Sequence, residues 1–237
     1  MSEQERDEQY LREGAGDDQE PRTRRHPIPS RHLLIGYGGP AGSGKDASAD
    51  HLVDRHGFTK LNMSDPLLAA MLILDPIIPA PGKYIAGAHM NSNERFSDLH
   101  KIFGYVETKK HPEVRRLLQQ LGTEFGRKVL GEDTWVNIAA RRIIQLREAA
   151  VASEDGNVAI TGIRYRNELE MIHRLGGTSV WVKRPSLTGI GALSAHSSEN
   201  SLSEEDFDAT LLNDGSLGDL ELATTKMFTT LNGRVNG

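Results

Sequence analysis

Short apolar runs alternate with amphipathic segments along this chain, and the alternation predicts its fold class. Five runs have the length and composition of buried strands: residues 32–38, 58–63, 158–164, 178–185 and 208–213. Apolar positions at helical spacing follow most of these runs: residues 45–52, 67–74, 167–175 and 217–231. Because strands and helices alternate, we predict an α/β fold with a doubly wound, five-stranded parallel sheet and helices on both faces.

The region between residues 75 and 150 departs from this alternation. Three prolines and a glycine prevent a long helix at its start, and a loop leading into a short helix is predicted for residues 91–100. Pro112 then opens one amphipathic segment, and the cap-like Asp133 precedes another. Four apolar side chains share one face of the first segment: Leu117, Leu118, Leu121 and Phe125. We expect residues 75–150 to form a helical insertion in a single domain that spans residues 32–237.

Two polar segments are predicted to lack regular structure. Residues 1–31 are almost free of large apolar side chains, so burial cannot offset the entropy lost on ordering, and we expect a disordered tail. A tail that binds a partner is the alternative. Residues 186–206 are rich in Ser and Gly, contain His196 and Glu199, and read as a mobile loop.

Composition excludes several classes of protein. The 237 residues carry a net charge of −5, which argues against a general nucleic-acid binder with a basic surface. The absence of cysteine excludes disulfides and thiolate chemistry. No apolar run has the length of a membrane-spanning helix, and the N-terminus has no signal-peptide core. We therefore expect a soluble, cytoplasmic protein with neither membrane nor nucleic acid as a partner.

The first predicted strand leads into a candidate phosphate-binding loop. The segment Gly39-Pro-Ala-Gly42-Ser43-Gly44-Lys45 fits the P-loop pattern Gly-x-x-x-x-Gly-Lys and lies between a strand and a helix. Glycines allow backbone amides to turn inward around a phosphate, and the helix adds its free N–H groups and the positive end of its dipole. A glycine-rich turn without function is the alternative, but the flanking strand and helix favour a nucleotide-phosphate site.

One position departs from the usual P-loop. The Ser or Thr that follows the lysine and ligates Mg²⁺ in most such loops is replaced by Asp46. The next residue is Ala47, and a hydroxyl appears only at Ser48. The magnesium ligands therefore stay open, with Asp46 and Ser48 as candidates.

Other polar residues are candidates for substrate contacts. Asp65 follows the second predicted strand, where open α/β sheets bind ligands, but it is equally well explained as a helix cap. Arg115, Arg116 and Gln119 lie away from the apolar face of their helix, and guanidinium groups suit bidentate phosphate contacts. Solvated surface arginines are the alternative at these positions.

From about Leu33 to the C-terminus, the chain resembles the bacteriophage deoxynucleoside monophosphate kinases, a branch of the P-loop nucleoside monophosphate kinases. The resemblance rests on blocks that stand in the same order: Gly44-Lys45-Asp46 with Ala49-Asp50, Arg115 to Thr123, Trp135-Val136, Arg164 with Asn167-Glu168, Gly176-Gly177 with Val182, Arg184 and Pro185, His196 with Glu199, and Asn213 to Leu217. The family's own loop reads Gly-Lys-Asp, which makes Asp46 less unusual.

The resemblance implies a P-loop NTPase-like fold and transfer of the γ-phosphoryl group of ATP to a deoxynucleoside monophosphate, giving the diphosphate and ADP. It further implies Mg²⁺ as a cofactor, nucleotides as small-molecule partners, a possible homodimer, and the host cell cytoplasm if the protein is phage-encoded. Residues 75–150 would then bind the acceptor, and residues 186–206 would act as a lid.

The same resemblance implies roles for individual residues. Lys45, Arg164 and Arg184 would be catalytic. The ATP-binding set would be Gly39, Gly42, Ser43, Gly44, Lys45, Asp46 and Ala47. The substrate-binding set would be Asp46, Asp65, Arg115, Arg116, Gln119, Trp135, Arg164 and Glu168. For Trp135, a place in the apolar core is the alternative.

Two departures from the family pattern leave rival functions open. The family often has Thr at the position of Ala47 and Asp at the position of Gly162, and both would be conventional metal-positioning groups. A kinase of a hydroxymethylated pyrimidine within phage DNA is one rival. A nucleotide-binding module without catalysis is the other.

Overall fold

The computed structural model of the protein describes residues 32–79, 84–85, 88–89, 93–150, 156–187 and 202–236. The predicted tail, most of the predicted loop at 186–206, and with it His196 and Glu199, lie outside the described residues. None of the helices that the structure describes is long and apolar enough to span a bilayer.

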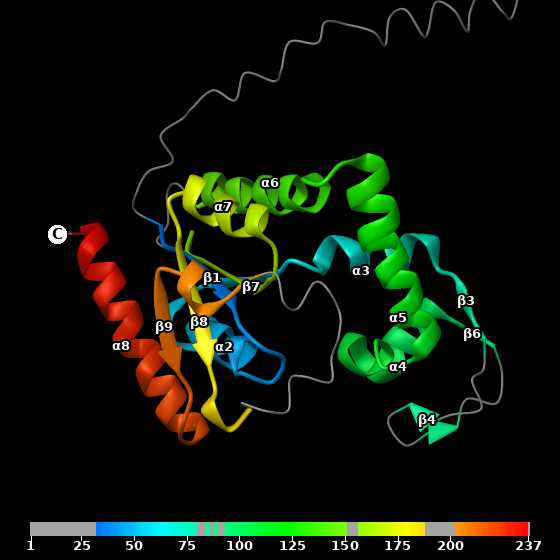
Figure 1. The fold of residues 1–237 in the computed structure, drawn as a ribbon, viewed down its shortest axis with the longest axis horizontal. Helices are drawn as coiled ribbons and strands as arrows, with labels where there is room; N and C mark the ends of the chain where they lie inside the picture. Colours follow the sequence, from blue (N-terminus) through cyan, green and yellow to red (C-terminus); the bar gives the residue numbers. More distant parts are fainter. Residues whose placement is uncertain are drawn as a thin grey trace, which may run out of the picture.

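Five parallel strands form the central sheet, which confirms the predicted α/β architecture (Figure 1). The strands are β1 (Leu34–Gly38), β2 (Thr59–Asn62), β7 (Val158–Ile163), β8 (Thr178–Lys183) and β9 (Ala209–Leu212). Their order is β2-β7-β1-β8-β9, so β1 is central and pairs with β7 and β8. The carboxyl ends of β1 and β7 are therefore adjacent, and the segments that follow them meet at one edge of the sheet.

Helices cover both faces of the sheet because successive side chains of a strand point to opposite sides. Ile35 and Tyr37 of β1 lie in the apolar cluster shared with α2 (Lys45–His56) and α8 (Leu217–Asn236). Leu34 belongs instead to the cluster on the other face. That cluster includes side chains of α6 (Thr134–Ala149) and α7 (Arg166–Arg174).

The predicted end of α2 is confirmed by its geometry. Gly57 adopts a left-handed conformation with φ 67°, and its N–H donates to the carbonyl of Leu52. This closes the helix and returns the chain to β2, as glycine does at many helix ends.

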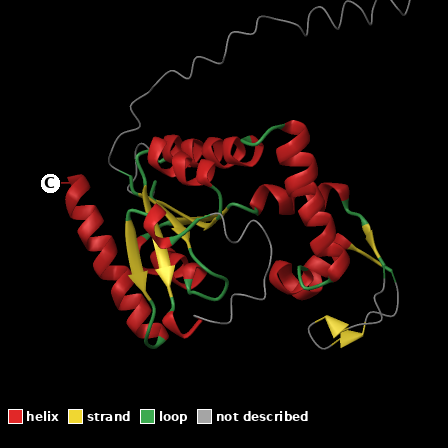
Figure 2. Cartoon of the chain, in the orientation of Figure 1, coloured by secondary structure: helices red, strands yellow, loops and turns green. Residues whose placement is uncertain are grey.

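The predicted insertion divides into two parts. Residues up to 130 form a unit to one side of the sheet: α3 (Asp65–Leu74), β3 (Ile77–Ile78), β6 (Glu94–Arg95), α4 (Phe96–Thr108), α5 (Pro112–Gln119) and the π-helix η1 (Gln120–Leu130) (Figure 2). This unit has an apolar core of its own: Met71, Ile78, Phe96, Leu99 and Val114. Helix α6, in contrast, packs on the sheet through Val136 and Ile143.

Regular structure within residues 75–111 exceeds the prediction. β3 pairs antiparallel with β6, and β4 (Tyr84–Ile85) pairs antiparallel with β5 (Ala88–His89). Such two-residue ribbons leave no periodic pattern in the sequence. The predicted short helix extends to Thr108 across a break at Gly104.

The predicted face of the α5 segment is also only partly buried. Leu117, Leu118 and Leu121 pack against the core of the insertion, whereas Phe125 is half exposed. Asp133 occupies the N-cap position of α6, but its carboxylate accepts a hydrogen bond from Asn167 Nδ2 at 2.8 Å instead of capping the helix. This bond joins the start of α6 to α7.

Short 3-10 helices border the part of the predicted loop at 186–206 that lies outside the described residues. Pro185–Leu187 (η2) follows β8, and Glu204–Asp206 (η4) precedes β9. Lys183 Nζ donates to Glu204 Oε2 at 2.7 Å, which ties the two borders together.

Candidate nucleotide-phosphate site

The loop between β1 and α2 requires glycine at its turning points. Gly39, Gly42 and Gly44 have φ values of 123°, 77° and 106°, which side chains with a Cβ rarely adopt. A Cβ at Gly39 would lie 2.5 Å from the Val182 carbonyl oxygen, and one at Gly44 would lie 2.7 Å from Asn213 Nδ2. The loop is therefore fixed against β8 and the segment after β9.

Lys45 folds over this loop. Its Nζ donates to the carbonyl oxygens of Gly39 at 2.7 Å and Pro40 at 2.6 Å. Asn213 Nδ2 donates to the Ser43 carbonyl oxygen at 2.8 Å, and Arg184 reaches the Gly42 carbonyl oxygen with an Nη1 distance of 3.5 Å. Two of the three predicted catalytic cations, Lys45 and Arg184, thus lie at the loop.

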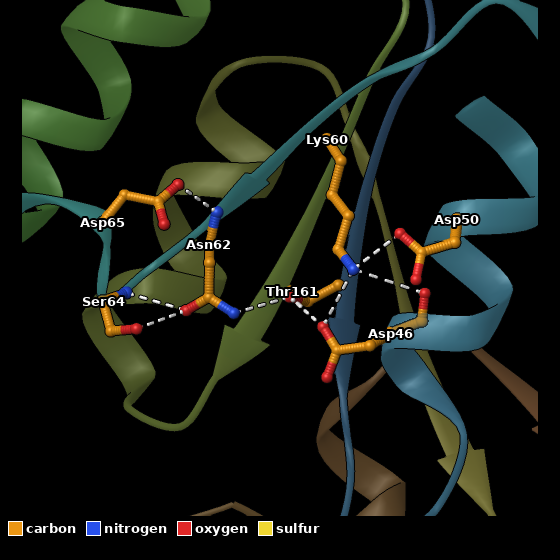
Figure 3. A network of polar contacts seen from close by, with 7 residues as sticks. All are labelled: Asp46, Asp50, Lys60, Asn62, Ser64, Asp65 and Thr161. Atoms are coloured by element: carbon orange, nitrogen blue, oxygen red, sulfur yellow. Dashed lines mark hydrogen bonds and ion pairs between the residues drawn. The ribbon is translucent and has the colours of Figure 1, made fainter. Parts of the chain in front are cut away.

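Asp46 points away from the loop toward β2 and β7 (Figure 3). Its Oδ1 accepts a hydrogen bond from Thr161 Oγ1 at 2.9 Å and lies 3.3 Å from Lys60 Nζ. Lys60 also donates to Asp50 Oδ1 at 2.8 Å. Burial acts to lower the pKa of Lys60, but the two carboxylates outweigh it and raise that pKa. Asp46 is therefore held in one orientation by a charged partner that the sequence did not reveal.

The chain after β2 is tied into the same network (Figure 3). Asn62 Nδ2 donates to Thr161 Oγ1 at 2.8 Å, and Asn62 Oδ1 accepts from the Ser64 N–H and hydroxyl at 2.9 and 2.8 Å. Asp65 Oδ2 accepts from the Asn62 N–H at 2.7 Å. Asp65 thus closes the turn between β2 and α3 while its side chain stays at the surface, and Ser64, not Asp65, is the N-cap residue.

Gly162 has a structural reason to be glycine. β7 shifts register against β1 between Tyr37 and Gly38, and Gly162 there has φ 86°. A Cβ at this position would also lie 3.2 Å from Asn62 Oδ1. The glycine that replaces the family's Asp therefore lies in a β-bulge next to the Asp46 network.

Arg164 is the first residue after β7, and its backbone is anchored by Glu168. The carboxylate of Glu168 accepts the N–H groups of Arg164 and Tyr165 at 2.7 and 3.1 Å and pairs with Arg127 Nη2 at 3.0 Å. Glu168 is only 5% exposed, and this burial raises its pKa against the lowering effect of those donors. These contacts favour a role for Glu168 in positioning Arg164.

A cluster of cations lies around Arg164. Lys109, on the turn after α4, interacts electrostatically with Arg164, Arg115 and Asp46. Its Nζ lies 4.4 Å from the centre of the Tyr105 ring. Burial lowers the pKa of Lys109, and the two guanidinium groups lower it further. The sequence-based prediction missed Lys109 and Tyr105 because they fall in the region with the weakest periodicity.

Other predicted substrate residues have internal partners. Arg116 forms a two-bond ion pair with Glu113 one turn earlier, at 2.6 and 2.8 Å. Trp135 is buried, donates to the Gly122 carbonyl oxygen at 2.8 Å and packs so closely on Gly126 that a Cβ there would lie 2.4 Å from the ring. Its contacts are those of a packing residue between α6 and η1. Gln119 is half-buried in the last turn of α5.

The two candidate magnesium ligands differ in access. Asp46 is 63% exposed in its side chain, next to the phosphate loop, and Mg²⁺ in phosphotransfer sites is held by one or two carboxylates plus phosphates and water. Ser48 is fully buried, so it does not fit, and Ala47 packs toward the core between the sheet and α8. Within the described ranges, no group of three or more acidic or histidine side chains forms a metal site. Asp46 therefore fits the requirement and Ser48 does not.

A family model and one curated relative identify the same family. The model of the deoxynucleotide monophosphate kinase family matches residues 68–223. A relative from Acanthamoeba polyphaga mimivirus, named "Putative deoxynucleotide monophosphate kinase", is 30% identical over 193 residues, which cover 76% of this chain and 88% of the relative. The uncharacterized protein ORF77 of Ictalurid herpesvirus 1 is 27% identical over 79% of this chain and 66% of its own length. Among solved structures, TT1252 from Thermus thermophilus is 21% identical, with a TM-score of 0.44, over 84% of this chain and 98% of that one.

Proposed function

We propose, from the premise that this chain belongs to the deoxynucleotide monophosphate kinase family, that it transfers the γ-phosphoryl group of ATP to a deoxynucleoside monophosphate and releases the diphosphate and ADP. Membership makes the chain a phosphotransferase that acts on nucleotides with ATP as the phosphoryl donor. What we propose beyond this is the class of acceptor, a deoxynucleoside monophosphate. It is supported above all by one juxtaposition: Asp46 directly follows the phosphate loop, and the same residue interacts electrostatically with Lys109, on which Arg164 and Arg115 also act.

The donor is proposed to lie in the loop. The left-handed glycines Gly42 and Gly44 and the N-terminus of α2 suit the β- and γ-phosphates. On binding, Lys45 Nζ would exchange its two carbonyl partners for phosphate oxygens, since both are neutral acceptors. Arg184, already at the loop through Gly42, would neutralise charge that develops during transfer.

The acceptor is proposed to lie on the β2 and β7 side of Asp46. Arg164 would bridge the two substrates, because its backbone is fixed at the end of β7 while its side chain is exposed. In this reaction the protein mainly holds two phosphates in line and excludes water. No general base is required, since the acceptor phosphate is already largely ionised at neutral pH.

Two further elements belong to the proposal. Mg²⁺, when bound at Asp46 and the donor phosphates, would supply neutralisation of phosphate charge. Lys60 and Thr161 would hold the Asp46 carboxylate in place for it. A homodimer is proposed by analogy with the family, and light scattering on the purified chain tests it.

The decisive experiment offers the purified chain ATP and a panel of acceptors. The panel holds the four common deoxynucleoside monophosphates, modified pyrimidine monophosphates and DNA with hydroxymethylated pyrimidines. ADP release is followed by a coupled assay, and the phosphorylated product is identified by chromatography. We expect a free mononucleotide to become the diphosphate.

Each other outcome names a different function. Labelled phosphate that appears in the DNA and in no free nucleotide would replace the proposal with a DNA-directed kinase. ATP binding by calorimetry, without ADP release with any acceptor, would overturn transfer to mononucleotides.

A further inference from the structure

Helix α4 is broken near its end, at Gly104. Gly104 has φ 74° and ψ 166°, far from helical values. The buried Thr108 hydroxyl stabilises the break by donating to the carbonyl oxygens of Gly104 at 2.8 Å and Leu99 at 3.2 Å. The residues after Gly104 therefore follow a direction that differs from the first part of the helix.

The redirected segment is anchored to the main sheet. The Tyr105 hydroxyl lies beside the Ser64 side chain, whose hydroxyl donates to Asn62 Oδ1 at the end of β2. Lys109 Nζ lies over the Tyr105 ring at 4.4 Å, a distance typical of a cation–π contact. Tyr105 thus connects the insertion to the sheet and places the ammonium group of Lys109.

The charges around Lys109 favour an anion. Arg164 from the end of β7 and Arg115 from α5 act on Lys109, and Asp46 is the acidic group that acts on it. Lys109 thus lies within electrostatic range of two guanidinium groups from separate segments and of a single carboxylate, which Lys60 already pairs. Like charges at close range cost free energy unless an anion compensates them.

We propose that Lys109 binds the phosphate of the acceptor nucleotide, together with Arg115 and Arg164, and that the break at Gly104 and the Tyr105 anchor place it there. This inference rests on the proposed function. The acceptor is favoured over the donor because the guanidinium groups that act on Lys109 come from the end of β7 and from α5, whereas Lys45 and Arg184 contact the loop.

The test compares Lys109→Met with Lys109→Arg and with Lys101→Met, an exposed lysine on the same helix. Steady-state kinetics give KM and kcat for the acceptor, and calorimetry gives the Kd of a non-hydrolysable ATP analogue. We expect Lys109→Met to lower kcat/KM for the acceptor roughly ten- to a hundredfold, as for loss of one charge-assisted hydrogen bond. The Kd of the analogue should change less than about twofold, since no donor contact is lost. Lys109→Arg should retain most of the activity.

A second readout separates binding from structural support. The pKa of Lys109 lies below that of an ordinary lysine, so its charge is lost at a lower pH. KM for the acceptor should therefore rise with pH in the wild type earlier than in Lys109→Arg, whose guanidinium stays charged. Thermal melting of each variant monitors the fold.

The outcomes distinguish the two proposals. If the wild type phosphorylates a mononucleotide but Lys109→Met has the same acceptor KM and kcat as Lys101→Met, the role of Lys109 is overturned alone. An equal loss of ATP-analogue affinity would place Lys109 on the donor side and also overturn it. A wild type that phosphorylates no mononucleotide overturns both proposals.

Discussion

The proposed donor and acceptor sides of the site are built in different ways. On the donor side, a single stretch of seven residues, Gly39 to Lys45, provides the loop, and each of its contacts with later segments fixes a backbone group. On the acceptor side, Lys109, Arg115 and Arg164 come from three segments, and side chains hold them in place. The loop is therefore set by backbone conformation, whereas the cation cluster depends on tertiary contacts.

Because of this difference, substitutions on the donor side should affect catalysis alone, whereas some on the acceptor side should also affect the stability of the fold. A change at Lys45 removes a charge whose task begins when nucleotide binds. A change behind Arg164, at Glu168, alters a buried ion pair and should weaken the fold as well. Substitutions on the acceptor side are therefore expected to lower the stability of the fold more than substitutions on the donor side.

The largest effect is expected on the donor side. Lys45→Ala should lower kcat about a thousandfold, ~4 kcal/mol, because it removes the cation nearest the transferred phosphoryl group. Steady-state assays should be compared with Lys226→Ala, an exposed lysine on α8, and both variants should melt like the wild type. A Lys45→Ala variant that keeps a tenth of wild-type kcat would contradict the assignment of the donor side.

Arg164→Ala should lower kcat about a hundredfold, ~2.7 kcal/mol, with little change in ATP affinity, because its proposed contacts are with the acceptor phosphate and with the charge that develops during transfer. Calorimetry with an ATP analogue and steady-state kinetics measure the two quantities. Arg174→Ala, an exposed arginine one helix later, is the control. Unchanged kcat would remove Arg164 from the site.

Glu168→Gln should lower the free energy of unfolding by about 2 kcal/mol, since Arg127 loses its charged partner in a buried place while the two backbone N–H groups keep an acceptor. Urea unfolding measures this change. Glu170→Gln, on the same helix but exposed, should be close to neutral. Equal stability of the two variants would show that the Arg127 pair does not support the acceptor side.

The smallest effect on stability is expected at Asp208, which lies at the edge of the sheet away from the proposed site. Burial would raise the pKa of Asp208, but hydrogen bonds from the Ser179 N–H and hydroxyl and the contact with His173 lower it. Asp208 therefore contributes stability above the unfolded-state pKa of about 3.9, and this is lost as pH falls through the lower folded value. The contribution should be below about 1 kcal/mol, since the group is partly exposed.

Urea unfolding of wild type and Asp208→Asn between about pH 5 and 2.5 tests this prediction. The variant should lose less stability on acidification than the wild type, and Asp214→Asn should behave like the wild type. Activity near neutral pH should be unchanged, because this edge contacts neither side of the site. Parallel pH curves for the wild type and Asp208→Asn would contradict the prediction.

Sequence reasoning captured elements whose signals are local. The five strands, the stop at Gly57 and the glycine positions of the loop were all predicted, since short apolar runs and the need for positive φ are marked on consecutive residues. The membership in a kinase family was likewise expected from ordered motifs and is confirmed by the match to residues 68–223.

The predictions were weaker where the role of a side chain depends on which residues contact it in the folded protein. Trp135 was expected equally as a pocket wall or as core, and its packing on Gly126 and bond to the Gly122 carbonyl are interior contacts. Arg115 and Arg116 are neighbours with identical chemistry, yet one lies by Lys109 and the other pairs with Glu113. The i, i+3 spacing from Glu113 could have indicated the partner of Arg116, whereas the surroundings of Arg115 depend on how α5 packs beside other segments.

The sequence by itself determined the α/β fold, the phosphate loop and the family, because strand and helix periodicity and glycine conformations are properties of neighbouring residues. Only the tertiary structure decided that Lys60 holds Asp46, that Glu168 anchors Arg164 and that Lys109 joins the cation cluster. Those contacts join residues far apart in the chain, and their distances are set by how the insertion packs beside the sheet.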